Sequence, residues 1–155
     1  MTTLLITPAE VLALAFPSAE YLREDTILPS KIETAQLRFL QPVFGPLYDR
    51  LGESRYGEFT DRYVKPALAC YVRCLVIAGQ GAAAGATGTM RPRTEYASDA
   101  GARTLTLMAA QARCDADTLL EQALRHVELY PDRFPEYDPE RNIRKKILIK
   151  GGFIL

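Results

Sequence analysis

A glycine-rich run at residues 76–85 is the segment of this sequence that most resembles a nucleotide-binding motif. There an apolar stretch leads into a glycine-rich turn, as in dinucleotide-binding folds, where glycines let backbone N–H groups approach a pyrophosphate. The apolar stretch, however, continues a helical pattern that begins at Tyr63, and the residues that follow contain Pro92. The strand before the turn and the helix after it are both missing. We therefore interpret the run as part of a flexible loop over residues 79–93.

Three thiols and one imidazole form a second set with potential chemistry. Cys70 and Cys74 are four residues apart on one face of a predicted helix, and with Cys114 and His126 they have the ligand types of a Cys₃His zinc site. The short Cys-x-x-Cys loop of structural zinc sites is absent, and cysteines in an apolar helix act as small hydrophobic residues. His126 is the only histidine and has charged neighbours, which is typical of a solvated helix face. We expect reduced, metal-free thiols, no cofactor and no catalytic residue.

Basic residues cluster near the end of the chain. They form either a solvated or partner-facing tail or a surface that faces DNA phosphates. Over the whole chain, 19 Lys and Arg balance 19 Asp and Glu, which argues against wholesale nucleic-acid binding and lowers the repulsion between copies. Any contact with DNA is therefore expected to be local and without sequence specificity. The residues assigned to this DNA-facing surface are Arg144, Lys145, Lys146 and Lys150.

Residues 146–155 are largely apolar and β-branched around a Gly-Gly pair, which is typical of a strand or a small hairpin. Such a segment is too apolar to lie comfortably in water, and unpaired strand backbone is a natural donor to a neighbouring sheet edge. It either folds back onto its own bundle or contacts another chain, and we predict the second. The residues assigned to partner binding are Ile147, Ile149, Phe153, Ile154 and Leu155.

Apolar side chains recur at helical spacing through most of the chain. Thr7, Pro8 and Glu10 have the pattern of a capped helix start, and Pro17 ends that short helix. Three further helices are predicted over about residues 29–41, 58–78 and 97–130. Pro42 should break the second of the four helices, and Pro66 should bend the third or mark its true start. The candidate core residues are Ile32, Ala35, Phe39, Leu40, Leu68, Val72, Leu75, Leu105, Met108, Ala112, Leu119, Ala123, Val127 and Tyr130.

These patterns predict an all-α bundle of about four helices with a short C-terminal β element. Residues 1–140 are expected to form the helical domain and residues 141–155 an interaction tail. Neither a signal peptide nor a membrane-spanning run of about 18 apolar residues is recognisable, so a cytoplasmic protein is expected.

Several motifs resemble one family of virus proteins. They are ILPSKIETAQ at residues 27–36, LQPVFGPLYDRL at 40–51, YVKPALACY at 63–71 and FPEY at 134–137. A helix that ends in a Pro-x-x-Gly turn followed by Leu-Tyr-Asp is similar to a pattern in the small head–tail connector (adaptor) proteins of tailed phages and prophages, particularly those of Bacteroides-like bacteria. The resemblance covers roughly residues 25–140.

This resemblance implies a helical subunit that joins other copies in a ring beneath the portal, around the DNA channel, without catalytic residues. The expected partners are further copies of the chain and portal or tail proteins, with packaged DNA nearby and no membrane. The expected location is the bacterial cytoplasm during assembly and then the virion. Two rival hypotheses are a small helical binding or regulatory module of a bacterial host, and an enzyme that uses the glycine-rich run or His126.

Overall fold

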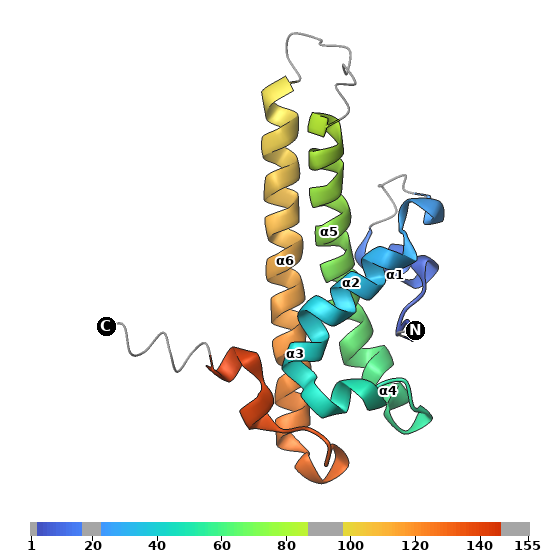
Figure 1. Ribbon diagram of the computed structural model, residues 1–155, viewed down its shortest axis with the longest axis vertical. Helices are drawn as coiled ribbons and strands as arrows, with labels where there is room; N and C mark the ends of the chain where they lie inside the picture. The colour runs from blue at the N-terminus through green and yellow to red at the C-terminus, as the bar shows by residue number, and fades with distance from the viewer. Residues whose placement is uncertain (1–2, 17–22, 87–97, 147–155) are drawn as a thin grey trace, which may run out of the picture.

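The computed structural model describes residues 3–16, 23–86 and 98–146 (Figure 1). Every regular element among these residues is helical, which confirms the predicted all-α class. The α-helices are α1 (Pro8–Ala15), α2 (Pro29–Ala35), α3 (Gln41–Phe44), α4 (Gly57–Phe59), α5 (Lys65–Ala86) and α6 (Ser98–Leu129). The π turns are η2 (Gln36–Leu40) and η5 (Thr60–Val64). The 3₁₀ turns are η1 (Glu24–Thr26), η3 (Gly45–Arg50), η4 (Ser54–Tyr56), η6 (Pro131–Arg133) and η7 (Pro139–Arg141).

An antiparallel hairpin of α5 and α6 forms the centre of the fold, and the shorter helices lie beside its middle and lower parts (Figure 1). Leu68 and Val72 of α5 are fully buried, as predicted, whereas Leu75 is only partly buried. The predicted core residues of the second helical segment, including Phe39 and Leu40, are buried as well. The helical bundle predicted from the sequence is therefore confirmed.

The N-terminus of α1 has the predicted capping box. The Thr7 hydroxyl accepts a hydrogen bond from the Glu10 backbone N–H, and the Glu10 carboxylate accepts one from the Thr7 N–H at 2.8 Å. Pro8 occupies the first turn, where its missing N–H removes no helical hydrogen bond.

Both prolines expected to disturb helices are accommodated by a π turn. η2 ends two residues before Pro42, and η5 ends two residues before Pro66. Proline lacks the N–H that would close a normal turn, and its ring collides with the carbonyl four residues earlier; a wider turn relieves both problems. The prediction that Pro42 breaks its helix is therefore wrong, because the chain stays helical to Phe44. Pro66 lies at the second residue of α5, but the chain is already helical from Gly57 through η5, so Pro66 does not mark the start of the helical run.

The glycine-rich run is helical where a loop was expected. α5 continues through Gly79, Gly81 and Gly85 to Ala86, so the predicted loop over residues 79–93 is wrong up to residue 86. Each glycine costs a helix about 1 kcal/mol relative to alanine. Here α6 lies alongside α5 (Figure 1), and tertiary packing outweighs such propensity costs.

The last long helix is uninterrupted from Ser98 to Leu129. Its buried face includes the predicted Ala112, Ala123 and Val127, but Tyr130 is exposed and was wrongly placed in the core. The helix also buries residues that were not predicted, because a strict period drifts over such a length. These residues are Ala116, Leu120 and Leu124.

The described part of the predicted tail packs against the bundle. Residues 143–146 are helical, so the β element predicted from Lys146 onward does not begin at that residue. The other residues of that element, 147–155, lie outside the described part of the chain. Gly45, in the turn after α3, has a positive φ of 55°, which favours glycine. Arg141, the first residue of the predicted tail, lies close to Gly45, so the tail begins against this turn.

Candidate functional site

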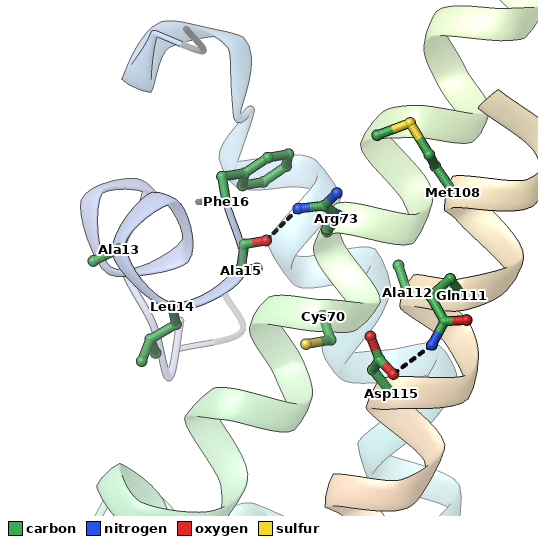
Figure 2. Close-up of a pocket in the computed structure, with 10 residues that line it drawn as sticks. All are labelled: Ala13, Leu14, Ala15, Phe16, Cys70, Arg73, Met108, Gln111, Ala112 and Asp115. Carbon is green, nitrogen blue, oxygen red and sulfur yellow. Dashed lines mark hydrogen bonds between the residues drawn. The ribbon is translucent and has the colours of Figure 1, made fainter. Parts of the chain in front are cut away.

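A groove of about 470 Å³ runs between α1, α5 and α6 and is open to solvent. Figure 2 shows α1 on one side, α6 on the other, and Cys70 and Arg73 of α5 between them. Most of the lining is apolar, with the charged Arg73 in the middle and Gln111 and Asp115 on the α6 side. The lining residues are Ala13, Leu14, Ala15, Phe16, Cys70, Arg73, Met108, Gln111, Ala112 and Asp115.

Arg73 holds the end of α1 against α5. Its guanidinium donates a hydrogen bond of 2.6 Å to the backbone carbonyl of Ala15, at the helix C-terminus, and lies 5.1 Å from the centroid of the Phe16 ring. The last carbonyls of a helix have no partner within the helix, so this contact satisfies one of them. Arg73 is also the only charged residue of α5 after Lys65. That isolated charge was the one sequence signal for the groove.

The groove lacks the groups that covalent chemistry needs. Burial raises the pKa of the Cys70 thiol, the Asp115 charge raises it further, and Arg73 only partly opposes this. Cys70 therefore stays a thiol at neutral pH, and the thiolate is the nucleophilic form. Asp115 accepts a hydrogen bond of 2.9 Å from the Gln111 side chain and has no ion pair among the described residues. This lining suits contact with an apolar segment, and Asp115 is positioned to pair with a positive charge on it.

A polar network lies on the other side of α6. The Tyr71 hydroxyl of α5 donates a hydrogen bond of 2.5 Å to Asp117 of α6, and Arg144 contacts both side chains. Arg113 forms an ion pair of 3.2 Å with the second carboxylate oxygen. Sequence reasoning missed this network. These residues fasten the described part of the tail to both central helices.

A comparison of the sequence with models of protein families assigns the chain to a family. Residues 36–147 match the model of DUF6712, described as a family of unknown function, and this segment is more than half of the 155 residues. The chain belongs to this family. No curated protein and no solved structure matches it significantly. The DUF6712 segment contains α5, α6 and the polar network, whereas α1, which forms one wall of the groove, precedes it.

The predicted DNA-facing residues have different surroundings within this DUF6712 chain. Arg144 is held by Asp117 and Tyr71, and Lys145 forms an ion pair of 2.5 Å with Glu128. Lys146 is exposed and Lys150 lies outside the described residues. The predicted partner-binding residues, Ile147, Ile149, Phe153, Ile154 and Leu155, lie outside the described residues too.

The sulfur and imidazole groups considered for zinc do not form a cluster in the part that the structure describes. Cys70 and Cys74 are partly buried on α5, while Cys114 is exposed on α6. His126 instead packs among aromatic rings, 4.7 Å from the Tyr63 centroid. Within the described ranges no group of three His, Cys, Asp or Glu could hold a metal ion. No described helix has the length and hydropathy to cross a membrane.

Proposed function

We propose that this DUF6712 protein is a structural assembly subunit, a head–tail connector (adaptor) of a tailed phage or prophage that forms a ring at the portal. The motifs that resemble connector proteins lie over residues 25–140, and most of that span falls within the family segment. The location proposed with it is the bacterial cytoplasm during assembly and then the virion. The partners proposed are further copies of the chain and portal or tail proteins, with DNA in the channel.

The observation that carries this proposal is the apolar groove between α1, α5 and α6. Leu14 at its edge is 48% exposed, and Met108 and Cys70 are only partly covered. Covering this apolar surface with a partner would favour association by about 25 cal/mol for each Å² removed from water. An apolar groove that stays exposed to water contributes no stability to a single subunit. In a ring, each subunit contacts its two neighbours through different faces, and such a groove can form one of them.

The occupant we propose for the groove is the apolar segment 147–155 of a neighbouring copy. Lys146 and Lys150 accompany these apolar residues in the sequence, and Asp115 at the groove edge is without an ion pair in the described part of the chain. Arg73, the other charged group of the groove, contacts the Ala15 carbonyl and the Phe16 ring, so Asp115 is the group with which the lysines of the segment would pair.

The residues just before this segment lie on the side of α6 that faces away from the groove of the same chain. Arg144 contacts Asp117, whereas the groove is lined by Asp115. Two residues along a helix are about 200° apart, so these two aspartates project from nearly opposite faces. A neighbour's segment reaches the groove without passing around α6, which favours exchange between copies.

Light scattering after size-exclusion chromatography, with and without a tailed-phage portal protein, tests the proposal. We expect an oligomer, or a stable complex with the portal, and its loss in Leu14→Asp. Leu28→Asp is the matched control, because Leu28 is 52% exposed but does not line the groove. A monomer that binds no portal or tail protein at high concentration would overturn the connector proposal.

A charge-reversal pair tests the occupant of the groove. Asp115→Lys should weaken assembly, and the double change Lys146→Glu with Lys150→Glu in the same chain should restore it. Restoration requires the two regions to meet. If the triple variant assembles no better than Asp115→Lys alone, another segment occupies the groove.

A further inference from the structure

A second pocket, of about 430 Å³, lies at the lower end of the bundle between η4, α4, η5 and the turn after α6. It shares no residue with the groove between α1, α5 and α6. Its lining combines aromatic rings with charged groups of both signs. The lining residues are Arg55, Tyr56, Glu58, Phe59, Arg62, Tyr63, His126, Asp132, Arg133 and Phe134.

His126 stands at the centre of the aromatic part. Its ring stacks on Tyr63 at 4.7 Å and on Phe59 at 5.8 Å, and meets the edge of Phe134 at 5.9 Å. Phe59 and Phe134 are themselves almost fully buried. The aromatic floor is thus fixed by packing, which makes a preformed site.

The charged groups of the pocket are unevenly paired. Arg55 lies 3.5 Å from Glu136, outside the pocket lining. Arg62 and Arg133, in contrast, have no carboxylate oxygen within 4.0 Å among the described residues. Each guanidinium lies near an aromatic ring instead, Arg62 at 5.4 Å from Tyr63 and Arg133 at 5.9 Å from Tyr130. Two guanidinium groups with free donors therefore flank one aromatic pocket.

The imidazole of His126 also has unused hydrogen-bonding capacity. Neither ring nitrogen has a hydrogen bond to another described residue. Burial lowers the pKa of His126, and the charges of Arg133 and Arg62 lower it further, against a weaker opposing effect of Glu58. A neutral imidazole offers one N–H donor and one acceptor nitrogen.

We propose that this pocket binds a single carboxylate group, carried by an acidic side chain of a protein partner next to an apolar or aromatic residue. Guanidinium groups match the planar carboxylate and bind it with paired hydrogen bonds. The neighbouring apolar group of the partner would pack on the partly exposed rings of Tyr63 and His126, which Phe59 and Phe134 support from below. This proposal is independent of the ring assembly, since the pocket and the groove share no residue.

The signs of the lining charges favour a carboxylate over a nucleic-acid strand. Arg62 and Arg133 carry positive charges, Glu58 and Asp132 carry negative ones, and Arg55 is paired with Glu136. The pocket is therefore close to neutral, and the paired donors of the two arginines, rather than an excess of positive charge, suit a single carboxylate. A nucleic-acid backbone would bring a row of phosphates past both carboxylates, and the chain as a whole has no net charge to attract it.

Titrations with small aromatic ions, followed by NMR signals of the His126 ring, test the proposal. The probe is benzoate, which joins a carboxylate to a ring that the aromatic floor accommodates; phenyl phosphate and benzylamine are the comparison probes. We expect benzoate to give a saturable shift and to bind at least tenfold more tightly than either comparison probe.

The double variant Arg62→Gln with Arg133→Gln should weaken benzoate binding at least tenfold, while Arg23→Gln, remote in the sequence and exposed, should leave it unchanged. Both guanidinium groups are on the surface, and an unchanged amide spectrum outside the pocket confirms folding; each single variant provides a second test. The proposal is overturned if benzoate causes no saturable shift, or if the double variant binds it equally well. Tighter binding of phenyl phosphate would assign the pocket to phosphate groups, and of benzylamine to cations; either result also overturns it.

Discussion

The hydroxyl of Tyr71 on α5 lies 2.5 Å from the carboxylate of Asp117 on α6, in a contact that joins the two long helices near the middle of the fold. Phe39 stacks on Tyr71 with ring centroids 4.2 Å apart, so the tyrosine also fixes the π turn after α2. Arg144 contacts the same hydroxyl from the C-terminal segment. One side chain thus connects four parts of the chain that are distant in the sequence.

Replacing Tyr71 by phenylalanine should destabilise the fold while preserving the ring stacking. The change removes a hydrogen bond to a charged group, which contributes about 1.5–3 kcal/mol. Asp117 retains Arg113 and Arg144, so we expect a loss of about 1–2 kcal/mol in the unfolding free energy measured with urea. Tyr130→Phe is the control, because Tyr130 is 48% exposed. Equal stability of the two variants would mean that the hydroxyl contributes nothing to the folded state.

The same network should make the protein sensitive to acid. Burial acts to raise the pKa of Asp117, but the hydrogen bond from Tyr71 and the charges of Arg113 and Arg144 outweigh it and lower the pKa below its ordinary value of 3.8. The folded chain therefore binds this proton more weakly than the unfolded chain. The resulting stabilisation is complete above the ordinary value and is lost as the pH falls through the lowered one.

Asp117→Asn provides the measurement. The difference in unfolding free energy between wild type and this variant should be largest at pH 7 and should shrink steadily below about pH 5, as protonation makes the wild-type carboxyl neutral. Asp25→Asn, in the exposed turn η1, serves as the control. A difference that stays constant from pH 7 to pH 2.5 would contradict the lowered pKa.

Two leucines on α5 should respond differently to truncation. Leu68 is fully buried, whereas Leu75 is only partly buried against the core. Leu68→Ala should cost about 2–5 kcal/mol through lost hydrophobic transfer energy and the cavity left behind. Leu75→Ala should cost clearly less in the same urea titrations. A loss at Leu68 below about 0.5 kcal/mol would mean that the site collapses without a cavity, contrary to its central position.

Local sequence signals predicted the parts of the fold that depend on neighbouring residues. The capping box of Thr7 and Glu10 was predictable because both partners lie within one turn. The helical state of residues 79–86 was not, because it depends on α6 lying alongside. The π turns before Pro42 and Pro66 were missed for another reason. Pro42 was expected to break its helix, and Pro66 to bend its helix or mark its start, whereas a widened turn lets the chain remain helical at both.

The candidate sites were less predictable than the helices. Asp117 and Tyr71 are 46 residues apart in the sequence, and their pairing depends on the register of α5 against α6. The groove likewise depends on where α1 lies on α5, and the isolated charge of Arg73 was the one feature of the sequence that indicated it. His126 was expected on a solvated face because its neighbours are charged, yet its ring packs against Tyr63 and Phe59.

The helical state of the glycine-rich run leads to a prediction about nucleotides. Backbone N–H groups inside a helix are bonded to carbonyls four residues earlier and cannot bind a pyrophosphate. Calorimetric titration with NAD or ATP should therefore show no binding. A micromolar dissociation constant that is abolished by Gly81→Val would support the rival enzyme hypothesis instead.

Two truncations separate the folding role of the C-terminal segment from its proposed role between chains. Removing residues 147–155 leaves Arg144 with Asp117 and Lys145 with Glu128, so helical circular dichroism and the melting temperature should stay nearly unchanged. Removing residues 142–155 also deletes those contacts and the buried Asn142, and should lower the melting temperature. The shorter truncation should nevertheless abolish assembly or portal binding in light scattering. Unfolding of the shorter truncation would place residues 147–155 in the chain's own core, and normal assembly without them would show that they are not the contact.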